Sequence, residues 1–195
     1  MRRTQDLNVR QQSPVRVTGT VASIVLSILI LDQFTKWWAL QNLGDGGCAE
    51  DGACIDLFWT LRLHLIFNPG ASFGTGESLG PVIGVVSFLM AGFMIWLATR
   101  TKGPSGQNVW LPRVIYASIA GGALGNGLDR LFRADDGFMT GKVVDFIDFQ
   151  WWPVFNVADM AIVLAVLGAI ARSIFAEDPK PASSDPILPD QQAER

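Results

Sequence analysis

Three acidic residues lie in or beside a long apolar stretch near the C-terminal end of the chain. Asp159 is the only charged residue between Trp151 and Ala171. A carboxylate inside a membrane-length segment costs about 2.5–3.5 kcal/mol on insertion scales, so such a residue is a candidate functional group. Asp145 and Asp148 precede the stretch in KVVDFIDF. Carboxylates that meet at a membrane surface indicate acid–base chemistry at the lipid boundary.

The composition of the chain is that of a membrane protein. Of its 195 residues, 49% are hydrophobic and only 17% are charged, and the mean hydropathy is +0.30. Soluble domains carry about 25% charged residues. The net charge of −3 and the isoelectric point near 5.0 argue against nucleic-acid binding.

Four segments are long and apolar enough to cross a hydrocarbon core, which takes about 20 helical residues. They cover approximately residues 17–40, 80–99, 109–128 and 151–171. The first ends in LDQFTKWW and not in small residues, so we expect it to be retained instead of cleaved as a signal peptide. We therefore predict an all-α membrane protein with four transmembrane helices in one domain, residues 17–175. We expect residues 1–16 to form a cytoplasmic tail and residues 176–195 to form a disordered cytoplasmic tail.

Basic residues predict the orientation of these segments. They occur in the N-terminal tail, in the connection between the second and third segments, and after the fourth segment: Arg2, Arg3, Arg10, Arg16, Arg100, Lys102, Arg172 and Lys180. The long connection over residues 41–79 has only Arg62. Because Lys and Arg in short loops favour the cytoplasmic side, both termini are expected there, with residues 41–79 outside.

Polar residues of different segments converge on one level. Asp32 lies fifteen residues after Val17, about 22 Å along a helix, which places it in the outer third of the first segment. Lys36 is one turn further on the same face. The same outer level holds the polar residues that end the third segment and begin the fourth: Asn126, Asp129, Arg130, Asn156 and Asp159.

Some of these residues also have a purely structural interpretation. Asp32 and Lys36 can form a structural ion pair near the interface, or they can support the site indirectly. Asp129 can pair locally with its neighbour Arg130 or terminate a helix. We expect the remaining acids of the third connection to be solvated loop charges: Asp135, Asp136 and Asp148.

Asn156 can serve as the N-cap of the fourth segment. Asp159 fits such a role less well, because it lies a turn inside the segment, and this favours a functional role. Asp145 alone would be an ordinary surface acid, and it becomes a candidate functional residue only because of the polar residues expected near it.

Alternating apolar residues predict a small extracytoplasmic β-sheet. The pattern runs over residues 57–67 and again over residues 142–150. In the second stretch we expect the acids Asp145 and Asp148 to turn away from lipid. The apolar residues of that stretch would then face the lipid: Val144, Phe146 and Phe149.

The motif FNPGASFG predicts a sharp turn at Asn68 to Gly70. A glycine lets another backbone approach closely, so this turn suits the binding of an extended peptide. The alternative is a plain turn that returns the chain to the membrane.

Other chemistries have few suitable residues. A zinc site needs three or four His, Cys or carboxylate ligands, and the single histidine, His64, is expected to be a strand residue. Cys48 and Cys54 would form a disulfide if their Gly-rich loop is extracytoplasmic, and otherwise remain thiols. A nucleophilic pair of Ser72 with Lys36 is conceivable.

Five motifs occur in sequence over all four segments: DQFTK (32–36), FNPGASFG (67–74), GNGLDR (125–130), VVDF (143–146) and FNVAD (155–159). Together they resemble the motif set of lipoprotein signal peptidase, also called signal peptidase II. The resemblance covers roughly residues 17–175.

The resemblance implies an aspartyl endopeptidase of the bacterial plasma membrane with its site at the extracytoplasmic face. Such enzymes remove the signal peptide of a diacylglyceryl-modified prolipoprotein by cutting before the lipidated cysteine. By motif match the catalytic pair is Asp145 and Asp159. Supporting or substrate-binding positions fall on Asn68, Gly70, Asn126, Arg130, Asn156, Asp129, Asp32 and Lys36. We expect no metal and no cofactor, contact with membrane lipid, and a monomer.

The residues are also compatible with two other functions. One is a non-enzymatic lipid- or proton-handling membrane protein in which Asp159 is a relay. The other is a Ser/Lys membrane peptidase that uses Ser72. Within the aspartyl interpretation, Asp129 is the main competitor of Asp145, because it lies at the same depth.

Overall fold

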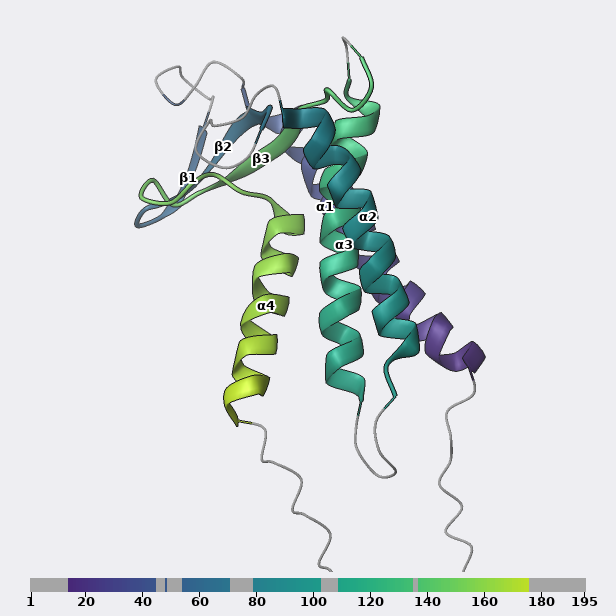
Figure 1. Cartoon of the computed structure of the whole chain (residues 1–195). Coiled ribbons are helices and arrows are strands. Elements are labelled where there is room, and N and C mark those ends of the chain that lie inside the picture. The colour runs from purple at the N-terminus through teal and green to yellow at the C-terminus, as the bar shows by residue number, and fades with distance from the viewer. Residues whose placement is uncertain are drawn as a thin grey trace, which may run out of the picture.

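A computed structural model gives the fold and describes residues 14–44, 48, 54–70, 79–102, 109–134 and 137–175. In chain order the elements are α1 (Pro14–Asn42), β1 (Cys54–Phe58), β2 (Leu61–Asn68), α2 (Gly80–Arg100), α3 (Trp110–Phe132), β3 (Val143–Asp148) and α4 (Val157–Phe175). The helices form an elongated bundle, and the sheet projects from one end of it above the start of α4 (Figure 1). The predicted combination of helices with a small sheet is therefore confirmed.

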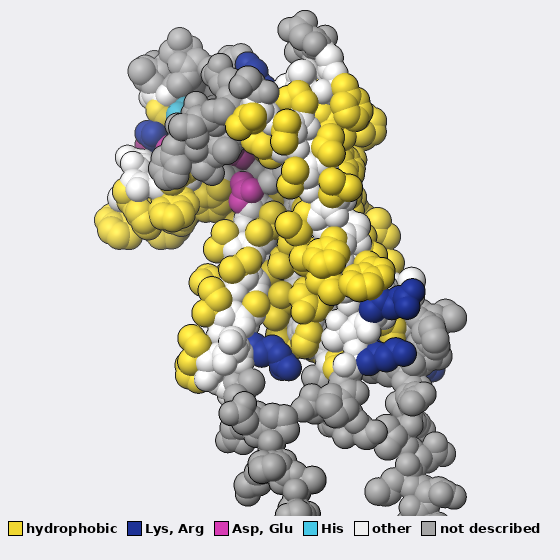
Figure 2. Space-filling view, in the orientation of Figure 1, with side chains coloured by type: hydrophobic (Ala, Val, Ile, Leu, Met, Phe, Trp, Pro, Cys, Tyr) yellow, Lys and Arg dark blue, Asp and Glu magenta, His cyan; other side chains and the backbone are white. Residues whose placement is uncertain are grey.

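Three of the four helices are long and apolar enough to cross a membrane, namely α1 over Arg16–Asn42, α2 and α4. Their outer surfaces carry exposed large hydrophobic side chains, and the space-filling view shows apolar atoms over the length of the bundle (Figure 2). This is the surface expected of a protein whose solvent is lipid.

The remaining helix, α3, is less apolar because it lies among the other three. Its described buried residues include four glycines, Gly121, Gly122, Gly125 and Gly127. A Cβ at Gly122 would lie 2.5 Å from the Ala158 carbonyl oxygen of α4, and one at Gly121 would lie 2.9 Å from Ile28 Cβ of α1. A Cβ at Gly127 would lie 3.1 Å from the Phe88 ring of α2. Small residues thus let the neighbouring helices approach α3 closely.

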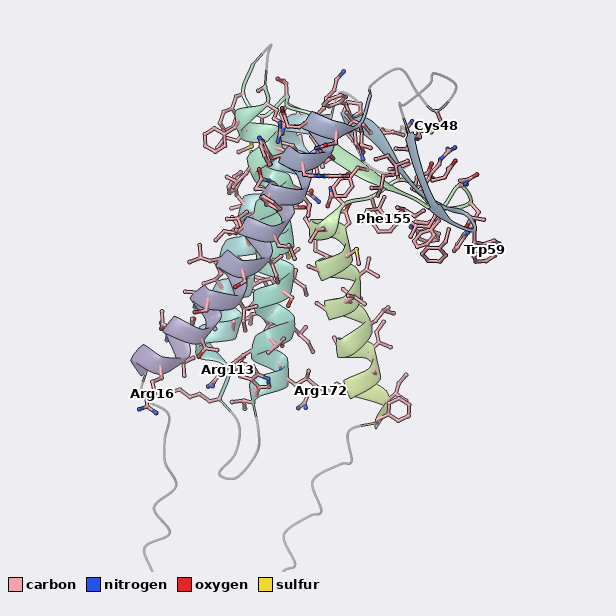
Figure 3. All side chains as sticks on the ribbon, turned by 180° about the vertical axis from the view of Figure 1, so that it is seen from behind. Arg16, Cys48, Trp59, Arg113, Phe155 and Arg172 are labelled. Carbon is pink, nitrogen blue, oxygen red and sulfur yellow. A yellow bond between two sulfur atoms is a disulfide. The ribbon has the colours of Figure 1, made fainter. Side chains whose placement is uncertain are left out.

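The sheet is antiparallel, with the strand order β1-β2-β3. The alternation over residues 57–67 is not one strand, because the chain reverses at Trp59 and Thr60 between β1 and β2. Trp59 has a φ of 51°, the left-handed backbone that this tight reversal requires. It lies at the far tip of the sheet (Figure 3).

The predicted orientation of β3 is wrong. Val144 and Phe146 do not face lipid but are buried against the end of α1 with Ala39, Leu43 and Leu65. Since side chains alternate across a strand, Asp145 points to the opposite face from these two residues. Hydrophobic alternation was present, but the buried partner was another helix and not the bilayer.

The fourth helix begins at Val157, six residues after the start of the predicted apolar segment, and Asn156 precedes it as the N-cap that the sequence offered. The chain first pairs with β3, because the Phe155 N–H donates to the Ile147 carbonyl oxygen at 3.1 Å and the Phe155 carbonyl accepts the Phe146 and Ile147 N–H groups. This pairing ties the beginning of α4 to the strand that carries Asp145.

Cys48 and Cys54 form a disulfide, the outcome that the sequence left open. Cys54 begins β1 and pairs with His64 of β2, so His64 is the strand residue that we predicted. The disulfide closes a short loop at the edge of the sheet.

Candidate active site

The site lies where the first turn of α4 meets β3 and the adjoining end of α3. Asp145 comes from the middle of β3 and is 2% exposed. Asp159 comes from the first turn of α4. In the space-filling view acidic side chains are visible between the sheet and the helices (Figure 2).

Asn156 connects the two carboxylates. Its side chain is fully buried, and its Nδ2 donates to Asp145 Oδ1 at 2.7 Å and to the Val144 carbonyl at 3.3 Å. Its Oδ1 accepts the backbone N–H of Asp159 at 3.0 Å. A single amide therefore holds Asp145 and also caps the helix that carries Asp159.

Asp159 takes part in this cap as well. One of its oxygens, Oδ2, accepts the backbone N–H of Asn156 at 3.3 Å, which completes a reciprocal capping box. The expectation that Asp159 fits a capping role less well, because it lies a turn inside the segment, is therefore wrong. Only Oδ2 is used in this way, since Oδ1 accepts Asn126 Nδ2 at 2.7 Å.

Asn126 of α3 links Asp159 and Asn156 to a buried cation, Lys36. Its Oδ1 accepts Lys36 Nζ at 2.9 Å and Asn156 Nδ2 at 3.0 Å. Because its carbonyl oxygen receives both donors, its amide nitrogen is left to face Asp159. Lys36 thus orients Asn126, which contacts Asp159 of the candidate dyad. Lys36 itself donates to neither carboxylate of the dyad.

Lys36 is the centre of a buried ionic cluster. Its Nζ lies 2.9 Å from Asp32 Oδ2 and 3.0 Å from Asp129 Oδ2, and all three side chains are at most 1% exposed. The predicted Asp32–Lys36 pair is confirmed. Asp129 pairs with Lys36 and with Arg133 Nε at 3.0 Å, and not with its neighbour Arg130 as the structural alternative proposed.

The two acids of this cluster also hold backbone. Asp32 Oδ1 accepts the Ala158 N–H at 2.9 Å, so an α1 side chain caps the start of α4. A Cβ at Gly125 would lie 2.5 Å from Asp32 Oδ2, so only glycine leaves room for this carboxylate. Asp129 Oδ2 accepts the Val144 N–H of β3 at 3.1 Å. Both elements of the candidate dyad are therefore fixed by one cluster.

The turn after β2 closes the site on its other side. Asn68 Nδ2 donates to Asp145 Oδ2 at 3.0 Å, and its Oδ1 accepts the Gly70 N–H at 3.1 Å. Arg130 donates to the Pro69 and Gly70 carbonyls at 3.2 and 2.7 Å. Arg130 thus holds the turn that positions Asn68. Ser72 and the rest of residues 71–78 lie outside the described residues.

The environment of Asp145 favours its protonated form. Burial and the nearby charge of Asp159 raise the pKa of Asp145 to about 7, although hydrogen bonds from Asn68 and Asn156 oppose this. A carboxyl group with such a pKa can hold a proton near neutral pH.

Asp148 behaves differently and corrects a prediction. It is not a solvated loop charge but a buried residue of β3, 3% exposed. Its Oδ2 lies 2.7 Å from Arg62 Nε and 3.4 Å from His64 Nδ1. Burial alone would raise the pKa of Asp148, but hydrogen bonds from the Gln150 N–H and Arg62 hold it below its usual value. Asp135 and Asp136 lie outside the described residues.

A cavity of about 630 Å³ opens beside the candidate dyad. Its walls come from α2, α3, α4 and the segment before α4, with apolar residues such as Ile83, Ile162 and Val163. The polar groups at its end include Asn68, Asn126, Arg130, Asp145 and Asp159. An apolar chain can therefore lie in the cavity while a polar bond reaches the carboxylates.

In the described part of the chain, one group of His, Cys and acidic residues has ligand atoms close enough for a metal: Cys48, Cys54 and His64. Its two sulfur atoms form the disulfide, so they are not thiolate ligands. The group does not include Asp145 or Asp159.

Sequence reasoning missed two contributors to the site. Gln33 Nε2 lies within hydrogen-bond distance of Gly125 O, Asp32 Oδ2 and Asp129 Oδ1, at 3.1–3.3 Å. Its polar side chain in an apolar segment beside Asp32 could have indicated this role. Gly125 is part of the motif GNGLDR, but only the structure shows that the Asp32 carboxylate occupies the space where a side chain at this position would lie.

The sequence has relatives among known proteins. The family model for signal peptidase II matches residues 24–175. A lipoprotein signal peptidase of Leifsonia xyli subsp. xyli is 33% identical over 163 residues, which cover 80% of this chain and 70% of the relative. That of Bifidobacterium adolescentis is 36% identical and covers 76% and 73%. That of Mycobacterium avium is 34% identical and covers 86% of both proteins.

The fold has a counterpart among solved structures. A bacterial membrane enzyme determined by the in meso method at 2.3 Å aligns with a TM-score of 0.63 at 23% sequence identity. The alignment covers 84% of this chain and 94% of that one. The match to the family model over most of the chain, together with relatives at 33–36% identity, identifies this protein as a member of the signal peptidase II family of bacterial membrane peptidases.

Proposed function

We propose that Asp145 and Asp159 are the catalytic pair with which this signal peptidase II removes signal peptides from prolipoproteins. The observation that carries the proposal is Asn156, which donates to Asp145 and caps the helix turn of Asp159. Aspartyl chemistry follows from the family, and the relatives bear the name lipoprotein signal peptidase. Asp129, the competing acid, has both oxygens engaged by Lys36, Arg133 and backbone.

The pair would work by sharing one proton. Two carboxylates held close together do not both ionise readily, so one stays protonated while the other is charged. The charged member takes a proton from a bound water as the water oxygen attacks the scissile carbonyl carbon. The protonated member donates its proton to the carbonyl oxygen. Collapse of the tetrahedral intermediate breaks the C–N bond, and the leaving amine receives a proton from the pair.

The neighbouring amides would prepare this chemistry. Asn68 and Asn156 both donate to Asp145, and Asn126 donates to Asp159. These donors fix the carboxylate planes before substrate arrives, which reduces the reorganisation needed in the transition state. The apolar cavity beside the pair suits the diacylglyceryl chains and the end of the signal helix.

We also propose that α3 is a fourth transmembrane helix. Its 23 residues extend about 34 Å, enough to cross a bilayer core. It is enclosed by three apolar helices, so its glycines and polar groups need not face lipid. Both termini would then lie in the cytoplasm, with the site and the sheet on the extracytoplasmic side. Since one chain supplies every group of the site, a monomer suffices.

Labelling of introduced cysteines tests this orientation, because the native cysteines are bridged. Lys142→Cys, exposed before β3, should react with a membrane-impermeant maleimide added to intact cells. Ser184→Cys in the C-terminal tail should react only after the cells are opened. Labelling of Ser184→Cys in intact cells would refute the proposed topology.

Cleavage of a defined substrate tests the function. Purified protein in detergent, incubated with a diacylated prolipoprotein, should release the signal peptide, and mass spectrometry should place the cut before the lipidated cysteine. Ser72→Ala should retain activity, whereas a Ser/Lys peptidase would lose it. If the wild-type protein cuts no prolipoprotein while Asp159→Asn abolishes proton uptake into vesicles, the relay alternative replaces the peptidase.

A further inference from the structure

A second cavity lies at the opposite end of the bundle from the candidate active site. It has a volume of about 270 Å³ and lies between α3 and α4, with Pro112, Ile115, Tyr116, Ala169, Arg172 and Ser173 around it. Arg172 follows Asp159 by thirteen residues, about 20 Å along α4. Figure 3 shows Arg172, Arg113 and Arg16 at this end, far from Trp59 and the sheet. The cavity is therefore at the level of the other membrane surface.

The cavity combines apolar walls with hydrogen-bond donors that have no partner in the described parts of the chain. Pro112, Ile115 and Ala169 supply the walls. Among the residues that the structure describes, Arg172 has no hydrogen bond or ion pair. The Tyr116 and Ser173 hydroxyls have no hydrogen bond within the same residues. Arg62 and Arg133, by contrast, each contact a carboxylate. A guanidinium and two hydroxyls around one space suit an anion with several acceptor oxygens.

The charge of this end has the matching sign. The acidic residues that the structure describes all belong to the sheet or to the candidate site and its cluster: Asp32, Asp56, Asp129, Asp145, Asp148 and Asp159. The basic residues described at the opposite end are Arg16, Arg100, Lys102, Arg113 and Arg172. An anion bound here meets only positive charge among these residues.

We propose that this cavity binds the phosphate headgroup of an anionic phospholipid, with Arg172 as its principal ligand. Arginine forms paired hydrogen bonds with phosphate oxygens, and the Tyr116 and Ser173 hydroxyls can donate further bonds. The glycerol and one acyl chain lie against Pro112, Ile115 and Ala169 and continue along the lipid-facing surfaces of α3 and α4. Basic pockets between transmembrane helices near a membrane surface are suited to such headgroups.

One competing occupant is carried by the chain itself. Glu177 and Asp178 follow α4 in the sequence, outside the described residues, and could provide a carboxylate instead of a lipid phosphate. The lipid is favoured because the cavity has apolar walls that a charged tail would leave uncovered. A truncation after Phe175 distinguishes the two occupants.

Lipid titration of the full-length protein tests the proposal. Phosphatidylglycerol added to detergent-purified protein should bind, as measured by native mass spectrometry, and should raise the thermal unfolding midpoint, while phosphatidylcholine should do neither. Arg172→Gln should weaken phosphatidylglycerol binding about tenfold or more. The matched control is Arg100→Gln, an exposed arginine at the same end of α2 that does not line the cavity, and it should stay within about twofold of wild type.

Four outcomes would overturn the proposal. Equal binding of phosphatidylcholine would show that the cavity does not recognise an anionic headgroup. An equal loss of phosphatidylglycerol binding in Arg100→Gln would show that general surface charge, and not the cavity, causes the binding. Phosphatidylglycerol binding that appears only after truncation at Phe175 would assign the cavity to the tail. Tyr116→Phe, which removes one hydroxyl and keeps the ring, should lose a smaller part of the affinity and confirms that the headgroup lies in this cavity. Unchanged binding in both Arg172→Gln and Tyr116→Phe would also refute the site.

Discussion

The two ends of the helix bundle differ in the burial and pairing of their charged side chains. At the sheet end Asp32, Lys36 and Asp129 are buried, and each has a partner within the protein. At the other end Arg100 and Arg172 are exposed. A polar group in a low-dielectric environment is costly unless it is paired, so the sheet end must supply its own partners. The other end can take its partners from water and lipid headgroups.

This difference follows from what each end has to hold. The candidate dyad needs two carboxylates from different elements, β3 and α4, in a fixed relation. The Lys36 cluster fixes both elements, since Asp129 binds the backbone of β3 and Asp32 binds the backbone of α4. Buried charge at this end therefore serves to position the site more than to stabilise the fold.

Removing either carboxylate should have the largest effect. Asp145→Asn and Asp159→Asn should each lower the cleavage rate about 10³-fold or more, because an amide can neither accept the proton of the water nor share one with its partner. The double variant should be hardly worse than either single one, since the two groups act as a unit. Rates are measured with diacylated prolipoprotein at fixed pH.

The control for these variants is Asp56→Asn, an exposed acid of β1, which should leave the rate unchanged. Asp148 is unsuitable as a silent control because it is buried against Arg62. Asp129→Asn should unfold more easily but retain cleavage in the folded fraction. If Asp129→Asn is inactive while folded and Asp145→Asn still turns over, the dyad is Asp129 with Asp159.

Lys36→Met should have the largest effect on stability. The variant leaves Asp32 and Asp129 buried without their cation, and breaking a buried pair in this way costs about 3–5 kcal/mol. The thermal unfolding midpoint in detergent reports the loss. Lys36→Met combined with Asp32→Asn should recover part of it, whereas an unchanged midpoint in Lys36→Met would show that the cluster is not needed for folding.

Acidity should control both rate and stability through Asp145. Its folded-state pKa of about 7 lies above its ordinary value of 3.8, so the folded protein binds the proton more tightly than the unfolded chain. This contribution to stability is complete below pH 3.8 and is lost as the pH rises to 7. The rate should fall on the alkaline side as the shared proton leaves, with a midpoint near pH 7. Asp145→Asn should lack this stability slope, and a rate that is constant from pH 6 to 9 would contradict the assignment.

The sequence predicted the membrane class, the small sheet and the common depth of the polar residues, because these depend on hydropathy and on helical rise. It did not predict which partner each acid contacts. Asp148 and Asp145 look equivalent in KVVDFIDF, yet one pairs with Arg62 and the other with Asn156. The pairing of β2 with β3 decides this, and its register shifts between Leu63 and Ile66 in a way that no local sequence pattern shows.

The start of α4 illustrates the same limit. Apolar composition continues from Trp151 through the helix, so composition alone places the start of the segment there, although Asn156 was also a candidate N-cap. The pairing of Phe155 with Ile147 delays the helix to Val157. Asp159 thereby lies in the first turn of α4, where its backbone N–H and one oxygen form the capping box with Asn156. Tertiary pairing and not composition created the position of the catalytic candidate.

The smallest effect is expected from exposed charges at the end opposite the sheet. Arg100→Gln combined with Lys102→Gln should change the free energy of unfolding by less than about 0.5 kcal/mol, since exposed side chains without buried partners contribute little. Thermal unfolding in detergent without added lipid measures this, with Lys36→Met as the comparison at the sheet end. A loss comparable to that of Lys36→Met would mean that both ends depend on internal ionic contacts. The contrast between a self-paired end and a solvent-paired end would then be wrong.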